Sequence, residues 1–90
     1  ILKADQGEAR LRQVERLLAE HGESAMLRYA RGALLAGLKR SDLARVDLQR
    51  SVELSPSVEA WVALCDLESG LGQLGAAQKA YAEAVRRFRA

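Results

Sequence analysis

Ninety residues provide for one domain at most, spanning 1–90, with only a modest hydrophobic core. Apolar residues make up 49% and charged residues 29% of the chain, a balance that excludes disordered and membrane-spanning classes. No apolar run approaches the roughly 20 residues that a membrane-spanning helix needs. The wealth of Ala, Leu, Arg and Glu favours helix throughout, so we expect an all-α protein without a sheet.

The charge distribution argues against a nucleic-acid partner, and the single cysteine and single histidine argue against a metal site. The 14 basic and 12 acidic residues are interspersed, so the net charge of +2 creates no field that would attract a polyanion. Cys65 is the single cysteine, which excludes an intramolecular disulfide and mildly favours a reducing compartment. With His21 as the only histidine, we expect neither a zinc site nor any cofactor.

Five helices are expected from apolar spacing and from residues that begin or end helices. The first is predicted over 7–21, with Gly22 as its stop, and the second over 24–38. The third is predicted from a cap at Ser41 or Asp42 and ends before Pro56.

The two remaining helices follow the proline. Ser57 is expected to cap the fourth helix, which ends where three glycines break the apolar pattern between residues 70 and 75. The fifth helix is predicted over 74–89. All five helices are short and closely spaced, so neighbours along the chain are expected to pack antiparallel.

An internal repeat appears when the chain is shifted against itself by 33 residues. Small residues then coincide in the middle of each unit's first helix and in the first turn of its second helix, where two helices must approach closely. The coinciding pairs are Gly32 with Cys65, Leu34 with Leu67, Gly37 with Gly70, Leu38 with Leu71, Ala44 with Ala77, and Val52 with Val85.

These residues resemble the tetratricopeptide repeat family. In family order the second unit carries Trp61, Leu64, Cys65, Gly72, Ala77, Tyr81 and Ala84, and the first carries Gly32, Leu35, Ala44, Leu48 and Pro56. The resemblance implies a right-handed α-solenoid of antiparallel helix pairs. It divides the chain into the helix of a partial preceding repeat at 7–22, repeat one at 24–56 and repeat two at 57–90.

The first unit departs from the family pattern at three positions. Arg28 and Arg31 stand where the second unit has Trp61 and Leu64, and Ser51 replaces a small apolar residue. Two interpretations stay open: the changes weaken packing against the N-terminal neighbour, or they mark a face that is exposed to solvent.

A narrower resemblance joins the chain to the C-terminal repeats of the HemY family, which are bacterial inner-membrane proteins associated with protoheme biosynthesis. It rests on the 33-residue spacing, one less than usual, and on the run Leu64, Cys65, Asp66 within residues 50–87. It implies that the chain, which starts at Ile1 without methionine, belongs to a longer protein whose missing N-terminal segments reach the membrane. The favoured location is the cytoplasm or the cytoplasmic face of the bacterial inner membrane.

The binding surface is expected on the concave face, which the first helices of successive units line in such arrays. On one side of the first unit's first helix lie Met26, Tyr29, Ala33 and Ala36, and the equivalent side of the second unit carries Glu59, Val62, Asp66 and Ser69. We expect this strip to hold a protein or peptide, with apolar contacts from Met26 and Tyr29 and selection of a basic group by Glu59 and Asp66. The alternatives are an ordinary solvated face or contact with a neighbouring helix of the intact protein.

The expected function is a non-catalytic scaffold for protein–protein interaction, because no acid, base or nucleophile residues are arranged for catalysis. Cys65 is expected to be buried and inert in a slot that requires a small side chain. The alternative function is structural: the units cap or extend a longer array, or form a homo-oligomer through Tyr81, Val85 and Phe88, which no following helix covers.

Overall fold

A computed structural model describes residues 4–89, and within that range it contains five α-helices and no strand. The expected all-α class is therefore confirmed. None of the described helices is long and apolar enough to cross a membrane. The helices are α1 at Ala4–His21, α2 at Ala25–Gly37, α3 at Ser41–Leu54, α4 at Val58–Gly70 and α5 at Leu74–Arg89.

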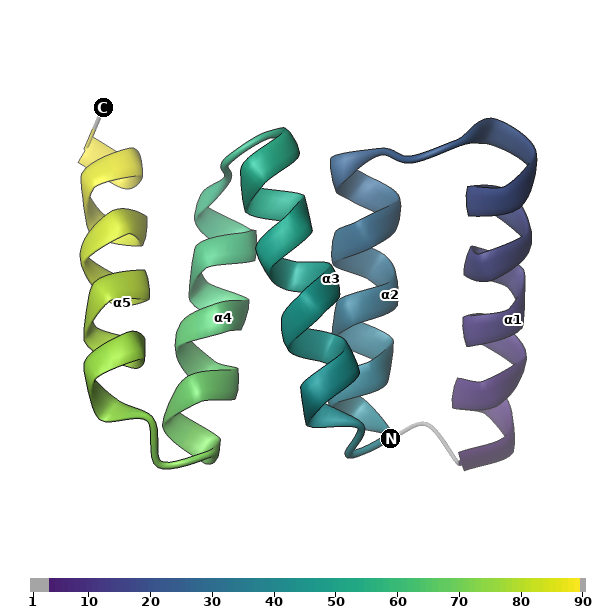
Figure 1. The fold of residues 1–90 in the computed structure, drawn as a ribbon, viewed down its shortest axis with the longest axis horizontal. Helices are drawn as coiled ribbons and strands as arrows, with labels where there is room; N and C mark the ends of the chain where they lie inside the picture. Colours follow the sequence, from purple (N-terminus) through teal and green to yellow (C-terminus); the bar gives the residue numbers. More distant parts are fainter. Residues whose placement is uncertain (1–3, 90) are drawn as a thin grey trace.

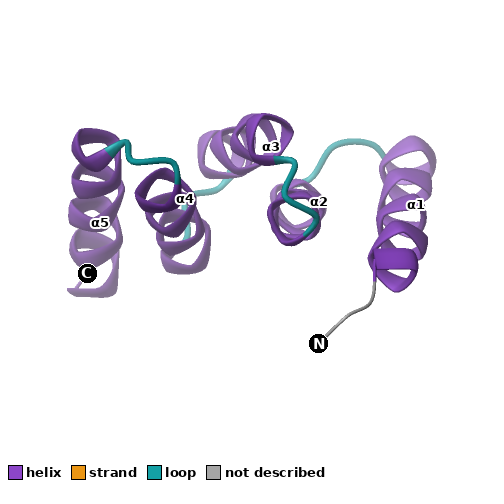
Figure 2. Ribbon diagram, turned by 90° about the horizontal axis from the view of Figure 1, so that it is seen from below, coloured by secondary structure: helices purple, strands orange, loops and turns teal. Residues whose placement is uncertain are grey.

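The helices stand side by side in chain order, with α1 and α5 at opposite ends of the row (Figure 1). Each helix contacts the next, and α2 also contacts α4. Because neighbours run in opposite directions, α2 and α4 are parallel to each other. Figure 2 shows α3 displaced to one side of the row relative to α2 and α4.

Serine caps begin two of the helices, as the sequence predicts for Ser57. The Ser24 hydroxyl accepts a hydrogen bond from the Leu27 amide at 3.1 Å, and the Ser57 hydroxyl accepts one from the Ala60 amide at 3.1 Å. Gly22 ends α1 with a φ of +82°, a conformation that favours glycine.

The predicted cap of α3 is wrong. Ser41 is already helical, and Arg40 occupies the capping position without a side-chain hydrogen bond. The reason is a tight turn after α2, in which Lys39 has a φ of +66° and the Arg40 amide donates to the Leu35 carbonyl at 2.9 Å. This turn brings the chain into α3 one residue earlier than the serine and aspartate signals indicate.

The core forms two adjoining clusters. Half-buried Leu67 packs against both of them, so the core is continuous from α1 to α5. One cluster consists of Leu48, Val52, Ala60, Leu64 and Ala80, and the other of Leu11, Leu35 and Ala44.

The small-residue positions lie where α2 and α3 approach closely, as expected. A Cβ atom at Gly32 would lie 2.8 Å from Leu48 Cγ and 3.3 Å from the Ala44 carbonyl oxygen. Ala44 itself is fully buried. Cys65, the equivalent of Gly32 in the second unit, packs against the larger core cluster but is only half-buried, so the prediction of a buried cysteine is correct only in part. The glycine therefore sets the separation of the first helix pair.

Candidate protein-binding groove

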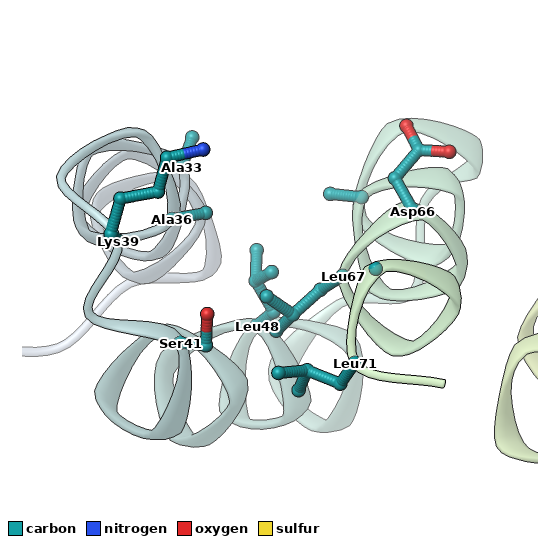
Figure 3. A pocket seen from close by; sticks show the side chains of 10 residues that line it. Ala33, Ala36, Lys39, Ser41, Leu48, Asp66, Leu67 and Leu71 are labelled. Carbon is teal, nitrogen blue, oxygen red and sulfur yellow. The ribbon is translucent and has the colours of Figure 1, made fainter. Parts of the chain in front are cut away.

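A hollow of about 470 Å³ lies between the C-terminal halves of α2 and α4. Figure 3 shows Leu48 of α3 at its base, with Lys39 on the α2 side and Asp66 on the α4 side pointing away from that base. The walls are mostly small or apolar side chains, so the hollow leaves room for side chains of a partner. Its lining residues are Ala33, Ala36, Lys39, Ser41, Leu48, Ala63, Asp66, Leu67, Gly70 and Leu71.

A second hollow of about 440 Å³ lies at the N-terminal ends of the same two helices. It is lined by Ala25, Met26, Tyr29, Ser51, Ser55, Ser57 and Glu59. Because both hollows use α2 and α4, they follow one another along the helix pair. We call them together the α2/α4 groove.

Six of the eight predicted binding residues line this groove. Met26, Tyr29 and Glu59 line its N-terminal hollow, and Ala33, Ala36 and Asp66 line its C-terminal hollow. The other two, Val62 and Ser69, are exposed on α4 but line neither hollow.

The α4 wall differs from the prediction by one position of helical register. Ala63, Leu67 and Gly70 take the places that the 33-residue shift assigned to Val62 and Ser69. Adjacent residues on a helix point about 100° apart, so this difference turns a neighbouring stripe of α4 towards α3. The α4 wall is consequently more apolar than expected.

The charges around the groove are divided between its walls. Glu59 and Asp66 stand seven residues apart on α4, which places two carboxylates on the same side of the helix about 10 Å apart along its axis. Lys39 lies at the end of the opposite wall. The apolar floor and the acidic α4 wall together fit a chain segment that carries apolar and basic side chains.

An ion cluster that was not predicted fixes α2 against α3. Asp47 of α3 is 2% exposed and lies between two arginines of α2. Arg28 donates to Asp47 Oδ1 at 2.8 Å, and Arg31 donates to both carboxylate oxygens at 2.8 and 2.9 Å. The carboxylate raises the pKa of the Arg31 guanidinium above its usual value. The two arginines are half-buried and hold a buried carboxylate of α3, so the interpretation as a face exposed to solvent is wrong.

The cluster extends to the loop before α2. The Glu23 carboxylate accepts a hydrogen bond from Arg28 at 2.9 Å and two from Arg50 of α3, also at 2.9 Å. Ser51, the third departure, donates to the Ala25 carbonyl at 2.8 Å. These bonds fix the N-terminal end of α2, which carries Met26 and Tyr29 into the groove. We call Glu23, Arg28, Arg31, Asp47 and Arg50 the α2–α3 ion cluster.

The sequence does indicate this cluster, through the residues at which the two repeat units differ. The 33-residue shift places Arg28 and Arg31 on Trp61 and Leu64, and it places Asp47 on Ala80. Two apolar residues on one helix are thus exchanged for cations, and their small partner on the other helix is exchanged for an anion. Such a concerted exchange predicts an ion pair at the contact between the helices.

A second ion pair joins the two repeat units. Arg45 of α3 donates from Nε at 3.0 Å and from Nη2 at 2.8 Å to Glu68 Oε1 of α4, and Glu68 is buried. Trp61 also packs at this join, against the core cluster that α3, α4 and α5 share. Among the described residues, the indole nitrogen of Trp61 is a buried donor that lacks a hydrogen-bond partner.

The Glu23 bonds give stability a predicted pH dependence. Hydrogen bonds from Arg50 are the main cause that lowers the pKa of Glu23 from 4.5 to about 2. A carboxyl group with a lowered pKa in the folded state stabilises the fold above pH 4.5 and loses this effect as the pH falls towards 2. We therefore expect the wild type to have a higher free energy of unfolding than Glu23→Gln in urea denaturation at pH 6. This difference should become smaller at pH 4 and smaller again at pH 3. The other carboxylates are present in both proteins and affect both equally. A difference in unfolding free energy that stays the same at all three pH values would therefore contradict the lowered pKa of Glu23.

No metal or thiol chemistry is evident in the described part of the chain. No group of three or more His, Cys, Asp or Glu side chains is placed there to hold a metal ion. Cys65 packs against the core on α4, while His21 is exposed at the end of α1, beside Glu20. Figure 1 shows these two helices separated by α2 and α3.

No family model, curated protein or solved structure matches the chain at a significant level. The resemblance to a repeat family therefore rests on the residues themselves, above all on the 33-residue spacing. The observed helix pairs are consistent with that spacing, since α2 and α3 recur as α4 and α5.

Proposed function

We propose that the chain is a tetratricopeptide-type helical repeat, a right-handed α-solenoid whose α2/α4 groove holds a segment of another protein without catalysing a reaction. The observation that supports this most is the position of the groove. It runs between the first helices of the two 33-residue units, the place where stacked helix pairs present a concave surface. Six residues chosen from the repeat alone line it.

The chemistry of the walls describes the segment that would bind. Leu67, Leu71 and the alanines of α2 would receive apolar side chains above the buried Leu48. Tyr29 offers an aromatic surface that packing against the core already holds in place. Glu59 and Asp66 would pair with basic groups about two helical turns apart. The proposed ligand is therefore an amphipathic segment with Lys or Arg beside its apolar residues.

The HemY-type resemblance extends this proposal to a cellular setting. On that basis the chain works in the cytoplasm or at the cytoplasmic face of a bacterial inner membrane, as the distal part of a longer repeat protein. The resemblance rests on residues 50–87. Among the described residues that line the groove, Met26 and Tyr29 are the ones whose side chains are of a type that can bind heme iron.

Selection of binding peptides from a displayed random library tests the proposal. Enriched peptides are expected to combine apolar residues with Lys or Arg. Tyr29→Ala should weaken their binding about thirtyfold, as for a central aromatic contact. Asp66→Lys should weaken it about tenfold by charge reversal.

Glu20→Lys provides the matched control, because it makes the same kind of charge reversal on α1, away from the groove. It should leave affinity unchanged within about twofold. Circular dichroism of each variant must retain the helical signal, since Tyr29 also packs against the core. Equal affinities of the folded Tyr29→Ala, Asp66→Lys and Glu20→Lys proteins would refute groove binding.

A further inference from the structure

The last helix carries an apolar face that the rest of the described chain leaves uncovered. Three alanines of α5, at positions 77, 80 and 84, are buried. An adjacent stripe follows the four-three spacing of a helix-packing seam. Leu74, Tyr81 and Phe88 on this stripe are 66%, 62% and 81% exposed. We call Leu74, Gln78, Tyr81, Val85 and Phe88 the α5 seam.

The first unit shows what such a seam does in this fold. The equivalent seam of α3, 33 residues earlier, includes Leu48 and Val52, which are 1% and 7% exposed because α4 packs over them with Ala60 and Leu64. Arg45, also on that seam, pairs with Glu68 of α4. The α5 seam thus has the position of a surface that receives another helix. It is larger and more apolar than its counterpart.

We propose that a second copy of this chain covers the α5 seam, with the two α5 helices packed antiparallel around a twofold axis at Tyr81. The seam is self-complementary in that arrangement: Leu74 and Phe88 lie seven residues to either side of Tyr81, so each Leu74 meets the Phe88 of the second copy. The two helix dipoles also oppose each other favourably. This interaction surface is separate from the α2/α4 groove.

The charges of α5 select the antiparallel arrangement. Arg86, Arg87 and Arg89 all lie in its last turn. Two parallel copies would bring the six guanidinium groups together and repel, whereas antiparallel copies place the two sets at opposite ends of the contact.

The size of the surface indicates a weak contact. Aromatic side chains bury roughly 150–250 Å² each, so four partly exposed aromatics and two Leu74 side chains would bury on the order of 800 Å². Stable interfaces bury about 1,200 Å² or more, so the dimer is a weak one that forms at roughly 10–100 µM.

Sedimentation of the full chain between about 5 and 500 µM tests this directly. The weight-average mass of the wild type should rise from monomer towards dimer, and Tyr81→Glu should remain monomeric throughout. Leu43→Glu places the same charge at another exposed apolar residue, on α3, and should sediment like the wild type. A wild type that is monomeric at every concentration, or a Tyr81→Glu protein that still dimerises, would overturn the proposal.

Disulfide trapping tests the orientation. In a Cys65→Ser background, an oxidised mixture of Leu74→Cys and Phe88→Cys proteins should yield mainly the mixed disulfide, because the antiparallel arrangement joins these two positions. Disulfides mainly between identical variants would indicate a parallel pair and contradict the twofold arrangement.

Discussion

Replacing Asp47 with alanine is expected to lower the free energy of unfolding by about 3–5 kcal/mol, because it leaves Arg28 and Arg31 without their shared buried carboxylate. A chain of this size is stabilised by only about 5–15 kcal/mol in total, so the variant should be close to unfolding at moderate temperature. Urea denaturation followed by circular dichroism measures the change. Asp42→Ala, at an exposed residue of the same helix, should change stability by less than about 0.5 kcal/mol.

The second repeat unit supplies a sharper control for the same cluster. A variant with four substitutions would give the first unit the residues that the second unit has at the equivalent positions. These substitutions are Arg28→Trp, Arg31→Leu, Asp47→Ala and Ser51→Ala. Exchanging a buried carboxylate together with both of its arginine partners for packed apolar residues is often neutral, so this protein should unfold within about 1 kcal/mol of the wild type. If the fourfold variant were as unstable as Asp47→Ala alone, the two units would not be structurally equivalent at this contact.

Gly32→Leu is expected to cost about 3 kcal/mol, at the upper end for an overpacked core. Even the first added carbon would lie within 3.3 Å of the Ala44 carbonyl oxygen, which belongs to the α3 backbone and cannot rotate away. The added side chain would push α2 from α3. Gly37→Leu, in open space at the end of the same helix, should stay within about 0.5 kcal/mol of the wild type. A loss at Gly37 as large as the loss at Gly32 would contradict the close-packing explanation, because helix propensity favours leucine over glycine at both positions.

The helices could be predicted because their signals are local. The caps at Ser24 and Ser57 and the stop at Gly22 act within one turn of the chain, so the sequence is enough to place them. The start of α3 could not be placed correctly, because it depends on the left-handed conformation of Lys39, a residue that has no strong turn preference. The fold class follows from composition, while this boundary follows from one dihedral angle.

The groove could be predicted only in part, for a reason that lies in α4. The repeat predicts Met26, Tyr29, Ala33 and Ala36 on one side of α2, where they line the two hollows, since their spacing is intrinsic to one helix. The rotation of α4 about its own axis depends on how Trp61 and the Arg45–Glu68 ion pair seat it against α3. This rotation brings Ala63 and Leu67 to the groove in place of Val62 and Ser69. The rotation of α4 is decided by contacts between the two units, and the 33-residue period carries no information about those contacts.

The most direct test of the proposed function is an amide chemical-shift map of the chain on titration with a selected apolar and basic peptide. Binding in the α2/α4 groove predicts that the shifted amides lie around Tyr29, Ala33, Ala63 and Asp66, with those of α1 and the α5 seam unchanged. Shifts centred on α1 or α5 instead, with α2 and α4 unaffected, would contradict the central claim and assign binding to another face.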